Sequence, residues 1–310
     1  MKASQAKLSI ALVTRNRPES LRRCLASLRQ QTVTDFEIVV SDDSDDAYIE
    51  RTREIALEFE ARYVVGPRKG LYANRNHIVK ACHGTHLLSA DDDHEYPPNY
   101  VERVLAAVNI EPSTIWCMGE VYDKSSLNAG PWHGPGQINP RGALVPITSE
   151  ESSHVWGISD GATVYPRFIF NRFRFFEKIR FGDGYKEFGC LLHFLGFRIR
   201  PLRDTGPLHH LYEVGRSFEK TYHEFAATYF AMLMFSFFYQ RRLVNMLITT
   251  IQLVSQFFIR PRDFALAIPI ALRWFKARRR QVIIWKESYS VGDTENSALT
   301  EPFCLREMIS

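Results

Sequence analysis

Short apolar runs alternate with amphipathic stretches along the first third of the chain. The apolar runs, which predict buried strands, lie at residues 8–13, 36–40, 63–65 and 86–89. Between them, apolar residues recur at helical spacing in a stretch that begins at Pro18 and in the stretches 47–62 and 71–82. Strands and helices that alternate with short connections predict an α/β fold, in which helices cover both faces of a mostly parallel sheet.

Acidic residues follow two of these expected strands. Asp42 and Asp43 come after the second strand, and Asp91, Asp92 and Asp93 come after the fourth. Ligands of such sheets bind beyond the carboxyl ends of the strands, so both acidic runs are expected at one crevice. Alternate carboxylates can reach one cation together, and oxygen ligands select Mg²⁺ or Mn²⁺. The pattern predicts a metal site, with a solvated acidic turn as the alternative.

The middle of the chain has a mixed pattern. It predicts helices near 99–108 and 185–195, strands near 114–122 and 161–165, and a Gly/Pro-rich loop at 129–142. We interpret residues 99–215 as the second half of one domain that covers residues 1–215. The composition changes after Arg216, so we expect residues 216–310 to form a separate helical region with a C-terminal tail.

Two apolar stretches open this last region. They cover residues 225–239 and 243–259, and each is shorter than the roughly 20 residues that a membrane-spanning helix needs. A helical hairpin that lies in the membrane interface, or re-enters from one side, fits these lengths. A helical pair packed on the first domain is the alternative.

A basic amphipathic helix is predicted to follow. Its expected apolar face holds Phe264, Ile268, Leu272 and Phe275. Its expected basic face holds Arg273, Lys276 and Arg280, and Trp274 lies at the margin. Residues 260–286 carry a local charge of +7, so that the rest of the chain, whose total charge is +4, sums to −3. Such a local patch favours contact of residues 225–280 with a membrane surface over binding to a nucleic acid.

Composition limits the class of protein. With 310 residues and 45% apolar residues, the chain can form a substantial core, which excludes a disordered protein. The five cysteines are scattered singly (Cys24, Cys82, Cys117, Cys190 and Cys304), which fits a reducing compartment. The first apolar run is too short for a signal peptide. We therefore expect a peripheral or monotopic protein at the cytoplasmic face of the inner membrane.

Four motifs in order resemble the nucleotide-sugar half of inverting glycosyltransferase family 2. They are Thr14-Arg15-Asn16-Arg17-Pro18, Asp42-Asp43-Ser44-Asp45, Gly70 with Asn74-Arg75-Asn76, and Ala90-Asp91-Asp92-Asp93 with Pro97. The match departs from the family at Ala90, where a larger apolar residue is usual, and at His94, which follows the acidic triplet directly. The resemblance implies a GT-A fold, with residues 1–98 as the nucleotide-sugar half and 99–215 as the acceptor half.

The resemblance also implies roles for individual residues. Thr14 and Asn16 would line the nucleotide pocket, and Asp42 would accept a hydrogen bond from the base of the nucleotide. Arg75 would approach the diphosphate. Asp91 and Asp93 would hold the ribose and an Mn²⁺ or Mg²⁺ ion. The other nucleotide-sugar-binding candidates in these motifs are Arg17, Asp43, Gly70, Asn76 and Asp92. His209 or His210 lies where relatives often have a histidine that completes the metal or diphosphate site; a packed histidine is the alternative.

Inverting transfer needs a base for the acceptor hydroxyl. The family places it in a Glu-Asp-x-Glu-Leu pattern before a Gly-Tyr/Phe-Arg-Ile strand, and the similar segment here is altered. Tyr185 falls at the expected base position, so Asp183 is the predicted base and Glu187 is its competitor. Either carboxylate could instead complement a helix dipole.

Together these features predict an inverting, metal-dependent transferase. It would move a sugar from a nucleoside-diphosphate sugar to a hydroxyl acceptor, in particular a lipid-linked glycan in polysaccharide assembly. The alternatives are transfer to polyprenyl phosphate, a catalytically silent membrane-bound scaffold and, more distantly, a nucleotidyltransferase.

Overall fold

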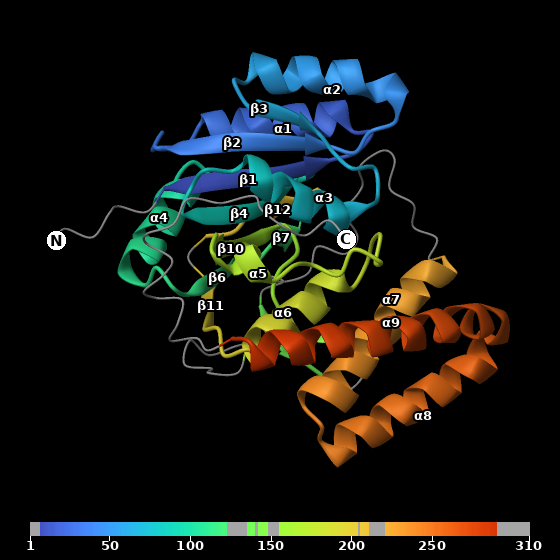
Figure 1. Ribbon diagram of the computed structural model, residues 1–310. Helices are drawn as coiled ribbons and strands as arrows, with labels where there is room; N and C mark the ends of the chain where they lie inside the picture. The colour runs from blue at the N-terminus through green and yellow to red at the C-terminus, as the bar shows by residue number, and fades with distance from the viewer. Residues whose placement is uncertain are drawn as a thin grey trace.

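The computed structural model describes residues 7–122, 135–139, 142–147, 155–203, 205–210 and 221–289 (Figure 1). Most of the Gly/Pro-rich loop, the expected boundary between residues 215 and 216 and the tail beyond residue 289 lie outside the described residues.

A seven-stranded sheet forms the centre of the α/β part, with the strand order β11-β6-β10-β4-β1-β2-β3. All neighbours pair in parallel except β10, which is antiparallel to both β4 and β6. The strands are β1 (Leu8–Thr14), β2 (Phe36–Asp42), β3 (Arg62–Val65), β4 (His86–Asp91), β6 (Ile115–Met118), β10 (Ala162–Pro166) and β11 (Ile199–Leu202). The mostly parallel sheet expected from the sequence is confirmed.

Helices cover both faces of this sheet, as Figure 1 shows. They are α1 (Pro18–Arg29), α2 (Asp46–Glu58), α3 (Leu71–Ile78) with the 3₁₀ turn η1 (Val79–Ala81), α4 (Tyr100–Ile110), α5 (Ile169–Arg172) and α6 (Gly184–Phe194). Every residue of β1 is buried, and alternate residues enter different cores. Ile10 and Leu12 pack with α1, α2 and α4, whereas Ala11 and Val13 pack with α3 and α6.

Two smaller sheets complete the part that holds the site. One joins β5 (His94–Glu95), β12 (Leu208–His209) and β7 (Val121–Tyr122), and the other joins β8 (Gly136–Ile138) and β9 (Leu144–Pro146). In the first of them, His94 pairs with His209. The predicted strand at 114–122 is therefore divided between β6 and β7, which belong to different sheets.

The C-terminal region is helical, as expected. It contains α7 (Tyr222–Leu233), the π-helical turn η2 (Met234–Tyr239), α8 (Leu243–Ile259) and α9 (Pro261–Glu287). Helices α7 and α9 share one hydrophobic core with α3, α6 and the sheet. Among the described residues, every helix is too short or too polar to cross a bilayer.

Helix α9 presents a different face to the protein from the one that the sequence indicates. Its buried residues are Ala267, Ala271, Trp274, Arg278 and Val282. Leu272, expected on the apolar face, is 43% exposed, whereas Trp274, expected at the margin, is 9% exposed. The hydrophobic pattern along α9 did not identify this buried face, because the contact with α7 is formed by small alanines and not by large apolar side chains.

Candidate active site

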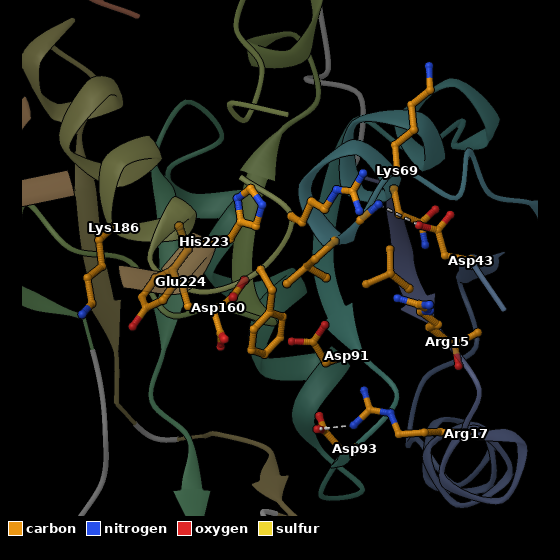
Figure 2. Close-up of a pocket in the computed structure, with 18 of the residues that line it drawn as sticks. Arg15, Arg17, Asp43, Lys69, Asp91, Asp93, Asp160, Lys186, His223 and Glu224 are labelled. Carbon is orange, nitrogen blue, oxygen red and sulfur yellow. Dashed lines mark hydrogen bonds and ion pairs between the residues drawn. The ribbon is translucent and has the colours of Figure 1, made fainter. Parts of the chain in front are cut away.

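A pocket of about 860 Å³ opens at the carboxyl ends of β1, β2 and β4. Figure 2 shows its elongated arrangement: Arg15, Lys69 and Asp43 lie at one end, and Lys186, His223 and Glu224 lie at the other. Asp91 and Asp93 lie between these groups. The sequence predicted a crevice at this edge of the sheet, and the acidic runs do meet there.

Arg75 organises one side of the pocket floor. Its guanidinium donates to both carboxylate oxygens of Asp91 at 2.9 Å, to Asp160 at 2.7 Å and to the Ser89 hydroxyl at 2.6 Å. Burial raises the pKa of Asp160 to about 7, although Arg75 opposes that shift. Arg75 itself is buried beneath the two carboxylates and is not among the residues that line the pocket.

Arg17 and Thr14 hold the next two carboxylates. Thr14 donates to Asp92 at 2.6 Å, and Arg17 pairs with Asp92 at 2.5 Å and with Asp93 at 2.9 Å. Burial raises the pKa of Asp92 to about 7. Burial acts in the same direction on Asp93, but the hydrogen bond and charge of His209 outweigh it and hold the pKa of Asp93 well below its usual range.

Two histidines approach Asp93. Ligand atoms of Asp93, His94 and His209 lie within 4.8 Å of one another. His209 also contacts Glu120 through Nδ1 at 2.9 Å, and its hydrogen bonds to Asp93 and Glu120 overcome burial to raise its pKa to about 10.

The two ring nitrogens of His94 differ in their hydrogen bonding. Its Nδ1 lies 3.2 Å from the carbonyl oxygen of Gly161, whereas its buried Nε2 has no hydrogen-bond partner among the described residues. Burial lowers the pKa of His94, which keeps the ring neutral. A neutral imidazole nitrogen beside a carboxylate and a second histidine fits a divalent transition metal such as Mn²⁺.

Gly161 permits this close arrangement. Its φ angle is +76°, and a Cβ atom there would lie 2.3 Å from Asp91 Oδ2 and 2.7 Å from His94 Cε1. Any larger residue would push the carboxylate and the imidazole apart, so glycine is required here.

The other end of the pocket is formed by the second acidic run. Asp43 lines it and accepts hydrogen bonds from the backbone N–H groups of Arg68 at 2.8 Å and Gly70 at 3.3 Å. Asp42 is fully buried and accepts from Ser44 N–H and the Tyr63 hydroxyl, and burial raises its pKa. Of the two aspartates, Asp43 is therefore the one that faces the pocket.

Two residues of the predicted nucleotide site bond to other protein groups and do not themselves line the pocket. Asn16 exchanges hydrogen bonds with Asp45 at 2.7 and 2.8 Å. Asn76 is buried, accepts from Phe175 N–H and donates to Glu177. Asn76 thus fixes the segment after α5, which the local motif could not reveal.

His209 and His210 point to different partners. His209 lines the pocket, whereas His210 contacts Glu95 at 3.1 Å and is absent from the lining. The two residues are adjacent in an extended segment, so their side chains leave on opposite sides. Of the two histidines, the structure brings His209 to the metal candidates.

The structure corrects the role considered for Glu187. This carboxylate is 1% exposed and receives two hydrogen bonds at 2.9 Å from the equally buried Arg278 of α9 and one from the Tyr239 hydroxyl. It therefore ties α6 to α9 and does not line the pocket. Asp183 precedes α6 and pairs with Lys186 at 2.9 Å; Lys186 lines the pocket, but Asp183 does not.

Sequence reasoning missed Asp160 and Glu120 and left the role of His94 undecided. Asp160 precedes β10, and because β10 is antiparallel, its start lies at the edge where the parallel strands end. The available signal was that Asp160 directly precedes the strand predicted at 161–165 and that Glu120 lies within the strand predicted at 114–122. The direction of the strands in the sheet was not visible in the sequence.

Comparisons with known proteins agree with this geometry. The family described as Glycosyl transferase family 2 matches residues 9–206, more than half of the chain. The chain belongs to this family. Its match spans the seven strands of the central sheet, both acidic runs and His94, and ends just before His209.

The chain is similar in sequence to three curated proteins. It is 30% identical over 112 residues to the putative glycosyltransferase EpsH of Bacillus subtilis (strain 168), covering 36% of this chain and 33% of that protein. It is 28% identical over 99 residues to the uncharacterized glycosyltransferase YwdF of the same organism, covering 32% and 37%. The third is chondroitin synthase of Escherichia coli, 29% identical over 100 residues, covering 32% and 15%. The matches thus span between 15% and 37% of the length of these relatives.

Two solved structures share the fold. TarS of S. aureus matches with a TM-score of 0.55 and 16% identity over 81% of this chain and 43% of that chain. GalNAc-T7 with UDP, GalNAc and Mn²⁺ matches with a TM-score of 0.57 and 14% identity over 73% of this chain and 48% of that chain. At these identities the likeness concerns the fold.

Proposed function

We propose that this protein is an inverting glycosyltransferase that uses a nucleoside-diphosphate sugar together with Mn²⁺ or Mg²⁺. The observation that carries the proposal is the group Asp93, His94 and His209 beside Asp91, in a family 2 pocket at the carboxyl edge of the sheet. When bound there, the metal would neutralise the charge that develops on the leaving diphosphate. The imidazole ligands favour Mn²⁺ over Mg²⁺.

The pocket's own residues suggest how the donor is oriented. Asp43, Arg15 and Lys69 at one end would receive the nucleoside, and Asp91, held by Arg75, would receive the ribose. Transfer forms the bond between the acceptor oxygen and the anomeric carbon and breaks the bond from that carbon to the diphosphate. The proton of the acceptor hydroxyl passes to a carboxylate of the protein.

Asp160 is the proposed base. It lines the pocket, and its pKa near 7 suits a group that accepts a proton at neutral pH. Asp183, the base indicated by the sequence, is the second candidate, and Tyr72 connects the two regions. The Tyr72 hydroxyl donates to the Gly182 carbonyl and lies 3.3 Å from Asp160.

The proposed acceptor is a hydroxyl of a lipid-linked glycan at the cytoplasmic face of a membrane. One relative is named for chondroitin synthesis, which supports a glycan acceptor. Thr221, His223 and Glu224 at the start of α7, and Trp274 of α9, line the pocket, and His223 and Glu224 lie at the end away from Asp43 (Figure 2). The C-terminal helices would therefore contact the acceptor directly.

The donor and metal can be tested by thermal unfolding. We expect UDP or another nucleoside diphosphate to raise the melting temperature when Mn²⁺ or Mg²⁺ is present, because a ligand that binds the folded state stabilises it. Asp93→Ala should remove the dependence on metal. Equal stabilisation by UDP with and without EDTA would contradict the metal role.

Activity needs a separate measurement. Release of the nucleoside diphosphate should require both a nucleotide sugar and an acceptor, and polyprenyl phosphate should be screened beside lipid-linked glycans. A protein that binds the donor but transfers to no acceptor in this screen would favour the silent scaffold.

A further inference from the structure

Helix α8 turns most of its polar side chains toward the protein, with Thr250 as an exposed exception. Asn245, Thr249, Gln252 and Gln256 recur at spacings of four, three and four, which places them on one helical face. Asn245 is 9% exposed and donates to Gln240, and Thr249 is fully buried and shares a 2.7 Å hydrogen bond with Ser236 of η2. These bonds fix the rotation of the helix about its axis.

The opposite face of α8 is apolar and exposed. It carries Leu243, Val244, Leu247, Ile251, Val254, Phe257, Phe258 and Ile259, whose exposure runs from 48% to 83%. Figure 1 shows α8 on the side of α7 and α9 that lies away from the sheet. In water a surface helix normally has the reverse arrangement, with apolar residues inward, so this face indicates an apolar environment.

Cations bracket this apolar face. Arg241 and Arg242 immediately precede α8, and Arg260 and Arg262 follow it; all four are exposed. The 17 residues of α8 include no charged side chain. An apolar helix with arginines at both ends matches a membrane interface, where acyl chains meet anionic headgroups.

A second copy of the chain fits this face less well. If α8 packed against α8 of a second copy, in a parallel or an antiparallel orientation, one pair of arginines would lie against another pair. Helix α8 itself offers no carboxylate to compensate them, and Asp263, which follows Arg262, supplies one carboxylate against four arginines. Like charges at an interface oppose association.

We infer that the exposed face of α8 inserts into the interface of an anionic lipid bilayer and that the helix lies along the membrane plane. This inference rests on the membrane location proposed above and makes it specific. It assigns the lipid contact to α8, which covers the second half of the interfacial hairpin expected from the sequence, and not to the basic amphipathic helix expected at residues 264–280.

The test compares two pairs of substitutions that change the charge equally. Leu247→Glu/Ile251→Glu alters residues that are 61% and 60% exposed on α8. The matched control, Leu57→Glu/Ile110→Glu, alters residues that are 59% and 78% exposed on α2 and α4. Binding is measured by co-sedimentation with vesicles of equal parts phosphatidylcholine and phosphatidylglycerol.

We expect the α8 pair to weaken vesicle binding by about tenfold or more, because apolar burial is lost and two anions face the headgroups. The control pair should change binding by less than about twofold. Equal binding by both pairs would overturn the inference. So would a wild-type dimer that the α8 pair converts to monomers.

A second readout keeps the test independent of the glutamate variants. Leu247→Trp should show fluorescence quenching by brominated phosphatidylcholine mixed with phosphatidylglycerol, in excess of that shown by Leu57→Trp. Equal quenching of the two reporters would also overturn the inference.

The proposed reaction and the proposed membrane contact can be tested independently of each other. Asp93→Ala should lose metal-dependent donor binding and still sediment with vesicles, whereas Leu247→Glu/Ile251→Glu should retain metal-dependent stabilisation by UDP. Retained vesicle binding in the α8 pair would refute the α8 assignment and leave the proposed transfer reaction standing.

Discussion

The pocket floor and the contact between α6 and α9 both bury charged side chains, but they compensate the charges differently. At the pocket, five carboxyl groups (Asp91, Asp92, Asp93, Glu120 and Asp160) make their ion pairs with Arg17, Arg75 and His209. Between α6 and α9, one carboxylate meets one guanidinium and a tyrosine hydroxyl.

This difference distinguishes a region that can bind a further ligand from a contact that only stabilises the fold. A region with more carboxylates than nearby arginines retains affinity for a further cation. Burial is the main cause of the raised pKa values of Asp92 and Asp160, and neighbouring carboxylates add to it. A matched pair such as Glu187 and Arg278 has its hydrogen-bonding capacity largely used inside the protein. Its role is to hold two helices in one position.

The largest effect is expected at the proposed base. Asp160→Asn should reduce turnover by roughly 10²–10⁴-fold, because the carboxylate that would accept the proton of the acceptor hydroxyl is removed. Stabilisation by UDP and Mn²⁺ should remain, which separates catalysis from donor binding. If Asp183→Asn has this phenotype and Asp160→Asn stays active, the base is Asp183.

Breaking the balanced pair should affect stability first. Arg278→Met leaves the Glu187 carboxylate buried without its cation, and we expect a loss of about 3–5 kcal/mol in the free energy of unfolding measured with urea. Arg279→Met, at an exposed neighbouring position, serves as the control.

A double substitution sharpens this result. Glu187→Leu/Arg278→Met removes both charges and should be more stable than Arg278→Met alone. A double variant that is as unstable as the single one would show that packing, and not the unpaired carboxylate, governs this contact.

A smaller change is expected when a partner of a metal ligand is altered. Glu120→Gln removes the charge beside His209 and should weaken Mn²⁺ affinity by roughly 10–100-fold, measured from the Mn²⁺ dependence of UDP stabilisation. Unchanged affinity would place His209 outside the metal site.

The smallest effect concerns a buried group that belongs to neither region. Burial lowers the pKa of His86, whose Nε2 lies 2.8 Å from the Pro112 carbonyl. A lowered folded-state pKa means that the unfolded chain binds the proton more readily, so stability present above pH 6.5 is lost as the pH falls. Unfolding at pH 8 and pH 5.5 should show a smaller decrease for His86→Gln than for wild type.

Patterns within short segments predicted most of the fold. The strands and helices up to α4, apart from the two-residue β5, were visible because each has its own periodicity and the central sheet there is parallel. Asp91 and Asp93 were found for the same reason, since they directly follow a buried strand.

Features that depend on distant segments could not be predicted. Asp160 required the antiparallel direction of β10, and His94 required its pairing with His209 across more than 100 residues. Arg278 looked like part of a basic surface because its partner, Glu187, is 91 residues away in the sequence. The polar stripe of α8 is local, but its inward direction is set by η2.

The position of Trp274 and the first turn of α7 in the pocket wall has a consequence for cooperativity. A molecule bound at that end contacts both the α/β part and the C-terminal helices, so its binding energy and the stability of those helices are linked. The linkage is reciprocal: any surface that steadies α7 and α9 raises the affinity of the pocket by the same factor. Slower amide hydrogen exchange in α7 upon acceptor binding would report this coupling directly.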